Sequence, residues 1–287
     1  MLKRQRILLG IVLSARQPLN RTRLFKLAFL LRQETSVGKD NSFYDFVPYD
    51  YGPYSFTLEK ELAELTRFGF IDPERLQANE EFLTTIQSEL GRMDLKMTEA
   101  IDHVIQEYGA LSRQSLVNHV YKKYPWFASR SKICKNPGVS KRAKTAVYTI
   151  GYEGKSIEGF FNDLIRAGIK LIVDVRNNPI SRKFGFSKQP LSKISKKFEI
   201  DYLNLPELGI PSALRKKLDN VQDYLVLLDE YDRLLLAKGA GYREKAASLV
   251  KEQPAALVCF EADFKLCHRS RLAEALAVDT GMPVIHL

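Results

Sequence analysis

The sequence predicts a mostly helical, winged-helix-like domain followed by an α/β domain, a Rossmann-like three-layer fold built on a parallel sheet. Apolar residues follow helical spacing through much of residues 1–130. Short apolar runs alternate with amphipathic helical stretches over residues 146–287, which is typical of α/β units. A basic stretch containing Pro137-Gly138 separates them. We therefore predict domains at 1–130 and 146–287, joined by a basic linker at 131–145.

Composition bounds the class of protein. The 287 residues are 45% hydrophobic and 27% charged, which is ordinary for a folded soluble chain. No apolar run reaches the roughly 18 residues of a membrane span, so no membrane partner is expected. The three cysteines are too few and odd in number for a disulfide framework, which predicts a reducing, cytoplasmic setting. The basic and apolar start of the chain has helical spacing and no small-residue cleavage site, which favours a helix over a signal peptide.

The first domain is predicted from caps and spacing. Asn20 is placed to begin a helix, and Ser55 or Thr57 to begin another that stops at Gly69. Phe70-Ile71 then resembles the start of a wing. The predicted helices cover residues 2–15, 20–31, 55–68, 98–108 and 112–124, with a short strand in the aromatic run at 43–55.

The second domain is predicted from apolar strand runs. Near-continuous runs such as 171–175 suit strands that are covered on both faces. The predicted strands are 147–150, 171–175, 202–205, 256–260 and 283–286, and the predicted helices are 156–167, 221–237, 242–251 and 267–276.

Positive charge is concentrated rather than spread. The formal net charge is +10. Ser131–Thr145 holds five basic residues and no acidic one, and Arg176–Phe198 holds seven and none. Such stretches favour a polyanionic partner. The alternative is that a solvated linker and loop bind nothing specific.

Polar side chains follow four of the predicted strands. Because ligands bind at the carboxyl ends of parallel strands, these residues are the candidate site. They are Gly151, Tyr152, Asp174, Arg176, Ser181, Arg182, Glu261, Cys267, His268 and Arg269.

The residue types suggest roles. Three arginines, Arg176, Arg182 and Arg269, are suited to bidentate contacts with phosphate, beside Gly151, Tyr152 and Ser181 as further ligand-binding candidates. Asp174 and Glu261 are the acid/base candidates. Cys267 at a helix start beside His268 is a candidate nucleophile with a lowered thiol pKa.

Structural interpretations stand beside these roles. Asp174 and Arg176 also suit a structural ion pair, and Cys259 suits a buried strand thiol. A zinc site from Cys259, Cys267 and His268 is disfavoured, because no Cys-x-x-Cys pair occurs and only three nitrogen or sulfur donors are near in sequence. No metal is therefore predicted. No cofactor is predicted either, because the sequence has no dinucleotide fingerprint and no Walker motif.

The second domain resembles the DUF488 family across residues 146–287. The resemblance lies in the order TIGYEG, VDVRNNPISRKFGFS, YLNLPELG and LVCFEADFKLCHRSRLA. The chain departs from the family at Tyr152-Glu153, where Gly151 is often followed by His-Ser, and at Ile210, often a second Gly. The resemblance implies an α/β fold and this site, but no reaction.

The first domain resembles the DUF4065 or Panacea type. The segments YDFVPYDYGPYS, FGFI and EYGALSRQSLVNHVYKKYPWFASRS carry the resemblance. It implies a partner-recognition module of toxin–antitoxin and phage-defence proteins, some of whose members are winged-helix relatives.

Three functions follow. The first is a nucleic-acid-associated protein, for DNA in preference to RNA, whose α/β domain binds a nucleotide or phosphate and processes it if catalytic. The second is a small-molecule enzyme using Cys267. The third is a non-catalytic module of a defence or antitoxin system, with a protein partner on the amino-terminal domain. Whether the protein is an enzyme stays open.

Overall fold

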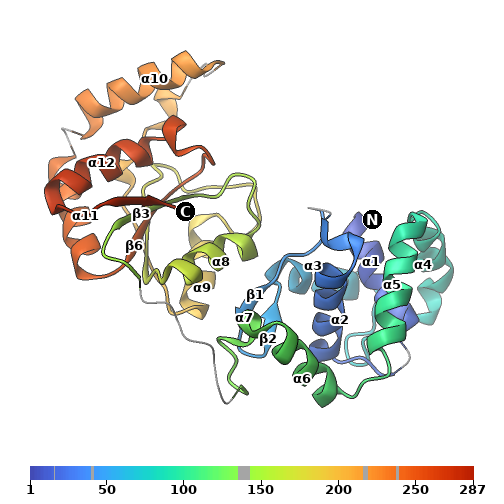
Figure 1. Cartoon of the computed structure of the whole chain (residues 1–287). Coiled ribbons are helices and arrows are strands. Elements are labelled where there is room, and N and C mark those ends of the chain that lie inside the picture. Colours follow the sequence, from blue (N-terminus) through green and yellow to red (C-terminus); the bar gives the residue numbers. More distant parts are fainter. Residues whose placement is uncertain (16, 40–41, 135–142, 216–218, 237–238) are drawn as a thin grey trace. The chain divides into compact units, whose positions relative to one another are not determined.

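The chain forms two compact units. The computed structural model describes residues 1–15, 17–39, 42–134, 143–215, 219–236 and 239–287 (Figure 1). The units are Met1–Val139 and Ser140–Leu287, so the division falls inside the predicted linker. The first part of that linker still packs on the first unit, since the backbone N–H of Lys132 donates to Asp50 O at 2.8 Å. Residues 135–142 of the linker lie outside the described residues.

The first unit is mostly helical, as predicted. Side-chain oxygens of Asn20, Ser55, Asp94 and Ser112 accept the N–H groups that begin four of its helices. Its helices are α1 (Lys3–Ser14), α2 (Arg21–Glu34), α3 (Phe56–Arg67), α4 (Leu83–Leu90), α5 (Leu95–Tyr108), α6 (Arg113–Lys123) and α7 (Pro125–Ala128), and its antiparallel hairpin is β1 (Val47–Tyr49) with β2 (Gly52–Tyr54).

Helix α2 forms the centre of this unit. It contacts α1, α5 and α6 as well as β2, and its side chains from Leu24 to Leu31 are all buried (Figure 1). The sequence did not predict α4. The segment expected to start a wing pairs only through the isolated bridge Ile71–Ala78 among the described residues.

The second unit is built on a five-stranded sheet. Its strands are β3 (Val147–Gly151), β4 (Leu171–Asp174), β5 (Asp201–Asn204), β6 (Ala255–Cys259) and β7 (Val284–His286). They lie in the order β5-β4-β6-β3-β7, and every pair is parallel. The predicted parallel sheet is confirmed.

Helices cover both faces of the sheet, giving three layers (Figure 1). One face carries α8 (Ile157–Ala167) and α9 (Lys188–Lys197), and the other carries α11 (Ala240–Glu252) and α12 (His268–Thr280), which contact β6 and β3. The predicted helix 221–237 is observed as α10 (Val221–Glu230) followed by a π-helical stretch at Tyr231–Leu236. Alternate strand residues, such as Leu257 and Cys259, share a core with α11 and α12.

The strand order places a crevice between β4 and β6. After β4 the chain turns toward β5 at one side of the sheet, and after β6 it turns toward β7 at the other. The loops diverge there, which is the position where open α/β sheets bind ligands. Within the described residues, no helix has the length and apolar character needed to cross a membrane.

Candidate functional site

The predicted residues divide between the two faces of the sheet. Asp174 ends β4 in register with Val258, whereas Cys259 ends β6 in register with Gly151. Successive strand side chains point to opposite faces. Asp174 therefore lies on the face opposite to Cys259, although both belong to the same sheet edge. The predicted constellation is two clusters.

The first cluster is a closed ion pair. Arg176 donates from Nε to Asp174 Oδ1 at 2.8 Å and from Nη2 to Oδ2 at 2.6 Å. Its Nη1 donates to the hydroxyl of Tyr152 at 2.9 Å and to Phe186 O at 2.8 Å. The hydroxyl of Tyr202 donates to Asp174 Oδ2 at 2.6 Å.

Burial and pairing make this cluster structural. Burial opposes the charge of Arg176, but the hydrogen bonds and charge of Asp174 outweigh it and raise the pKa of Arg176. Burial and the charge of Asp174 raise the pKa of Tyr202 as well. Because Asp174 is fully buried and accepts from both neighbours, it has little capacity left for a ligand.

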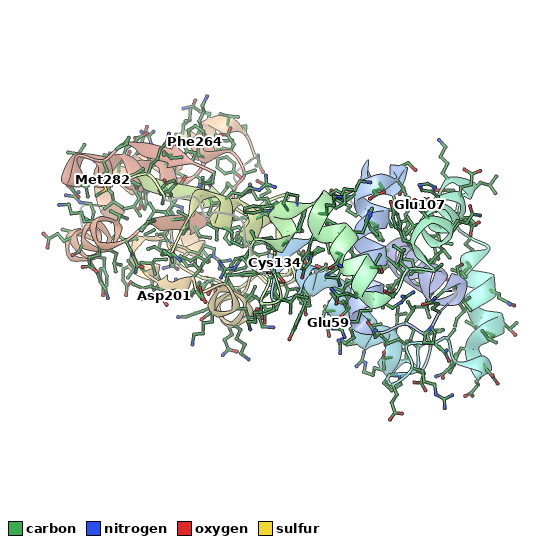
Figure 2. The ribbon with its side chains drawn as sticks, turned by 60° about the horizontal axis from the view of Figure 1, so that its bottom comes forward. Glu59, Glu107, Cys134, Asp201, Phe264 and Met282 are labelled. Atoms are coloured by element: carbon green, nitrogen blue, oxygen red, sulfur yellow. The ribbon has the colours of Figure 1, made fainter. Side chains whose placement is uncertain are left out.

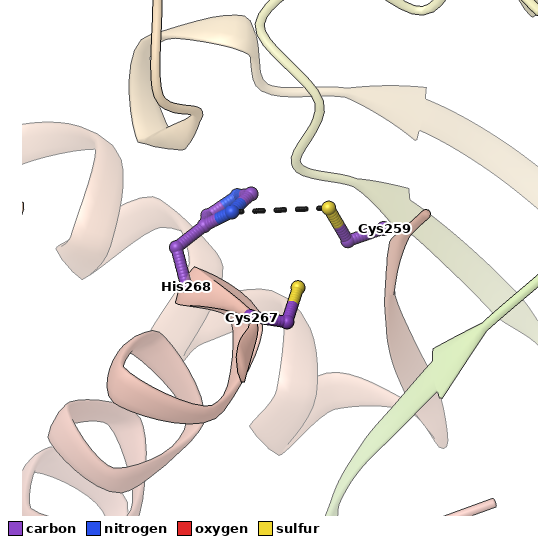
Figure 3. Close-up of side chains that lie close together, drawn as sticks. All are labelled: Cys259, Cys267 and His268. Carbon is purple, nitrogen blue, oxygen red and sulfur yellow. Dashed lines mark hydrogen bonds between the residues drawn. The ribbon is translucent and has the colours of Figure 1, made fainter. Parts of the chain in front are cut away.

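The second cluster, the sulfur–histidine cluster, consists of Cys259, Cys267 and His268. Figure 3 shows the two thiols and the imidazole pointing toward a common centre, from the end of β6 and the start of α12. The Sγ atoms and a ring nitrogen all lie within 4.8 Å of one another, and the three side chains are buried. His268 Nδ1 lies 3.8 Å from Cys259 Sγ, and Nε2 lies 3.1 Å from Val175 O. Among the residues that the structure describes, these three form the cluster of side chains that could hold a metal ion.

Two ionisable side chains border this cluster. Glu261 Oε2 lies 3.2 Å from Cys259 Sγ. Arg215 donates from Nη1 to the other oxygen of Glu261, Oε1, at 3.2 Å. Burial, and next the charge of Cys259, raise the pKa of Glu261.

The two thiols differ in their acidity. Burial opposes ionisation of Cys259, but hydrogen bonding from Cys267 and the positive charge of His268 hold its pKa well below the ordinary value. Burial and then Cys259 raise the pKa of Cys267 well above its ordinary value. Burial lowers the pKa of His268, but Cys259 outweighs it and the net shift is upward. The sequence predicted a lowered pKa for Cys267, whereas the structure raises it.

Arg269 holds the loop that follows β6. Its side chain is buried, and its Nη1 and Nη2 donate to Glu261 O at 2.5 Å and to Ala262 O at 3.1 Å. Gly151 permits this loop to approach, since a Cβ on it would lie 1.9 Å from Glu261 O. Both residues therefore position the loop.

A pocket of about 310 Å³ lies at the crevice between β4 and β6. We call it the edge pocket. It contains three arginines, the Asp174-paired Arg176 together with Arg182 and Arg215, in a polar setting of amides and hydroxyls. Its lining consists of Tyr152, Arg176, Asn177, Asn178, Ile180, Ser181, Arg182, Ile210, Ser212, Arg215, Cys259 and Phe260.

The edge pocket collects only some of the predicted residues. Tyr152, Arg176, Ser181 and Arg182 line it, whereas the side chains of Asp174, Glu261, Cys267, His268 and Arg269 do not. Sequence reasoning missed Arg215, and it interpreted Cys259 as a buried strand thiol and disfavoured a zinc set that contained it. A usable signal for Cys259 was its place as the last strand residue, with the same parity as the apolar residues that face α12.

A second pocket of about 400 Å³ lies in the first unit. It is lined by the aromatic run from Tyr49 to Tyr54 and by Lys26 of α2. Lys26 is 2% exposed, and its Nζ donates to Tyr51 O at 2.6 Å. Burial lowers the pKa of Lys26 to about 7.

Comparison with known proteins supports the resemblance of the second unit. The family model described as "Domain of unknown function DUF488" matches residues 156–276, a segment that runs from α8 through most of α12. The predicted DUF488 resemblance is thus confirmed for that segment. No curated protein and no solved structure matches the chain.

Proposed function

We propose that the chain is a nucleic-acid-associated protein whose second unit binds a phosphate group or nucleotide in the edge pocket. The observation that carries this proposal is that Arg182 and Arg215, besides the Asp174-paired Arg176, line a polar pocket at the switch point of a parallel sheet. A volume of about 310 Å³ lies at the small end of ligand pockets, which suits a phosphate or a single nucleotide.

The available donors support an anion rather than a neutral ligand. Arg182 is exposed and makes no ion pair with another described residue. Ser181 Oγ accepts from the N–H of Lys183 at 3.1 Å, which leaves its own O–H for a ligand. Arg215 is half-buried and carries one ion pair to Glu261. Arginine forks bind phosphate oxygens in pairs, and partial burial strengthens the contact.

The surrounding charge extends this site into a surface for a polyanion. The acid-free stretch Arg176–Phe198 begins at the edge pocket and continues through α9, which carries several lysines. Exposed lysines give phosphate affinity without sequence preference. The nucleic acid is therefore held along α9 while one phosphate or nucleotide occupies the edge pocket.

A protein partner of the first unit is the second candidate. The observation that favours it is the aromatic pocket around Lys26. This pocket is built by the YDFVPYDYGPYS segment that carries the DUF4065 or Panacea resemblance. In this proposal the first unit is a winged-helix-like recognition module.

Use of Cys267 as a nucleophile has little support. Its side chain is 1% exposed and does not line the edge pocket, and its pKa is raised. We therefore do not retain the small-molecule enzyme that depends on it.

The test measures binding of labelled single- and double-stranded DNA and RNA at several salt concentrations. Arg182→Ala is compared with Lys170→Ala, which removes an exposed positive charge at the opposite, amino-terminal edge of the same sheet. We expect Arg182→Ala to weaken binding and to reduce the slope of log affinity against log salt by about 1. Lys170→Ala should have a much smaller effect.

Two results would contradict the proposal. One is the absence of binding to any of the nucleic acids at low salt. The other is an equal loss of affinity in both variants, because nucleic acid would then bind to positive charge anywhere on the surface rather than to the edge pocket. Products are examined in the same samples, and any cleavage or base loss identifies the reaction.

A further inference from the structure

The sulfur–histidine cluster has the donor set of a metal site. Two thiols and an imidazole are the ligands that zinc prefers, and a Cys₂His set is one of its known combinations. The three side chains come from the end of β6 and the start of α12, with seven residues between Cys259 and Cys267, and they converge on one point (Figure 3). Sequence spacing hides this, because Cys259-x₇-Cys267-His268 is not a tight pair.

The distances are close to those that a tetrahedral ion requires. Zinc–sulfur and zinc–nitrogen bonds of about 2.3 and 2.1 Å place neighbouring ligand atoms roughly 3.4–3.8 Å apart. Cys259 Sγ and His268 Nδ1 are 3.8 Å apart, and all the donor atoms lie within 4.8 Å of one another. Side-chain rotations that move a donor atom by about 1 Å therefore bring the set to these spacings.

The imidazole is held in the orientation that a ligand needs. Its Nε2 lies 3.1 Å from Val175 O, and a carbonyl can only accept, so Nε2 carries a proton. Nδ1 is then the nitrogen that faces the thiols. A backbone carbonyl behind a histidine is the usual support of a metal-binding imidazole.

A carboxyl lies beside the three donors, close to one of the thiols. Glu261 Oε2 is 3.2 Å from Cys259 Sγ, and Arg215 holds the opposite oxygen. Thiolate and carboxylate are anionic when they bind a metal, so a divalent cation suits a nearly buried space that holds two thiols and a carboxyl. Cys259 also lines the edge pocket, which gives the ion a route from solvent.

We propose that Cys259, Cys267 and His268 bind one zinc ion at the inner wall of the edge pocket, with Glu261 beside the site. The ion would join the end of β6 to the start of α12. This inference does not rest on the proposed function, because the donor set and its geometry are independent of what occupies the edge pocket.

The experiment measures metal in the full-length chain. The protein is purified under reducing conditions without chelator and its metal content is determined. It is then stripped and titrated with zinc and with cobalt(II). We expect one ion per chain and a thiolate-to-cobalt charge-transfer absorption.

Two serine variants and one control locate the site. Cys259→Ser and Cys267→Ser should each weaken zinc binding by more than about 100-fold, since altering even the groups behind the ligands costs about 10–100-fold. Cys134→Ser is the matched control, because Cys134 (labelled in Figure 2) belongs to the first unit and should leave binding unchanged.

A second measurement keeps the test decisive if a variant does not fold. Zinc should protect Cys259 and Cys267 of the wild-type chain from alkylation, mapped by peptide mass, while Cys134 reacts at the same rate with and without zinc. Absence of stoichiometric metal and of the cobalt band in the reduced wild-type chain would overturn the proposal. A Cys259–Cys267 disulfide whose reduction restores no metal uptake would overturn it as well.

Discussion

Two clusters lie at the same edge of the sheet and differ in how fully their polar groups are satisfied. The Asp174–Arg176 pair is closed by Tyr152, Tyr202 and Phe186 O, so its charges are compensated within the protein. The sulfur–histidine cluster brings two thiols and a carboxyl together beside one imidazole and one arginine. A buried pair with its hydrogen bonds satisfied is typical of a structural role, whereas buried thiols that converge on an imidazole are the donor set of a metal site.

The largest effect is expected from breaking the closed pair. Asp174→Asn leaves the guanidinium of Arg176 buried without a counter-charge, and we expect it to lower the free energy of unfolding of the second unit by about 3–5 kcal/mol. Unfolding of this unit is followed in urea by alkylation of its buried thiols, Cys259 and Cys267, without zinc. Asp201→Asn is the control, because Asp201 is exposed at the start of β5 (Figure 2) and should change stability by less than about 0.5 kcal/mol. Similar stability of both variants would show that the pair is dispensable.

The next largest effect is expected from zinc binding to the sulfur–histidine cluster. Free zinc at about 100 times its dissociation constant should raise the free energy of unfolding of the wild-type second unit by about 2.7 kcal/mol. It should not stabilise Cys267→Ser, and it should stabilise Asp174→Asn to the same extent as the wild type. Hydrogen exchange of the β6 and α12 amides, with and without zinc, measures this. Equal stabilisation of Cys267→Ser would place zinc elsewhere.

A buried lysine that makes no ion pair with a carboxylate among the described residues extends the comparison to the first unit. Lys26 has a folded-state pKa of about 7, below its unfolded value of 10.5, so the unfolded chain binds more protons between these values. The free energy of unfolding of the first unit should therefore rise with pH over this window, by about 1–2 kcal/mol between pH 7 and 8.5. The fluorescence of Trp126, the single tryptophan, reports on this unit.

The control for this pH dependence is Lys26→Met. This substitution removes the titrating amine and keeps a side chain of similar volume on α2. The free energy of unfolding of the variant should therefore vary less with pH over the same window. If the wild type and Lys26→Met have the same slope, another group is responsible.

The smallest effect concerns the hydroxyl that completes the closed pair. Tyr202→Phe removes the donor to Asp174 Oδ2 but leaves the charge of Arg176 compensated, so we expect a loss of about 1 kcal/mol. The same urea alkylation measurement applies. A loss as large as that of Asp174→Asn would mean that the hydroxyl, rather than the counter-charge, holds the cluster together.

Several features of the fold were predictable because their causes are local. Asn20, Ser55 and Ser156 begin helices through hydrogen bonds to residues three positions on, so the chain near each start contains the information. Helix α4 was not predicted, since it follows an irregular segment and has a single fully buried residue, Ile86. The wing expected at Phe70-Ile71 depends on strand pairing, which local sequence does not specify.

The candidate site was predictable only as a location. Polar residues at strand ends marked the carboxyl edge of the sheet, and Tyr152, Arg176, Ser181 and Arg182 do line a pocket there. Arg269 and Arg182 have the same chemistry in the sequence, but one is buried against loop carbonyls and the other is exposed. Only packing distinguishes an exposed arginine that lines a pocket from a buried one that holds a loop.

The sequence by itself determined that the second unit is a parallel sheet covered by helices, because apolar runs with this spacing bury both strand faces. It also determined that the edge of this sheet is rich in arginine. The tertiary structure alone decided which strand-end side chains meet. The strand order and register turn Asp174 to one face and Cys259 to the other, where α12 begins with Cys267 and His268. Tyr152, just after β3, and Tyr202, in β5, reach the Asp174–Arg176 pair from other parts of the sheet, so their meeting depends on contacts between distant segments that no local pattern encodes.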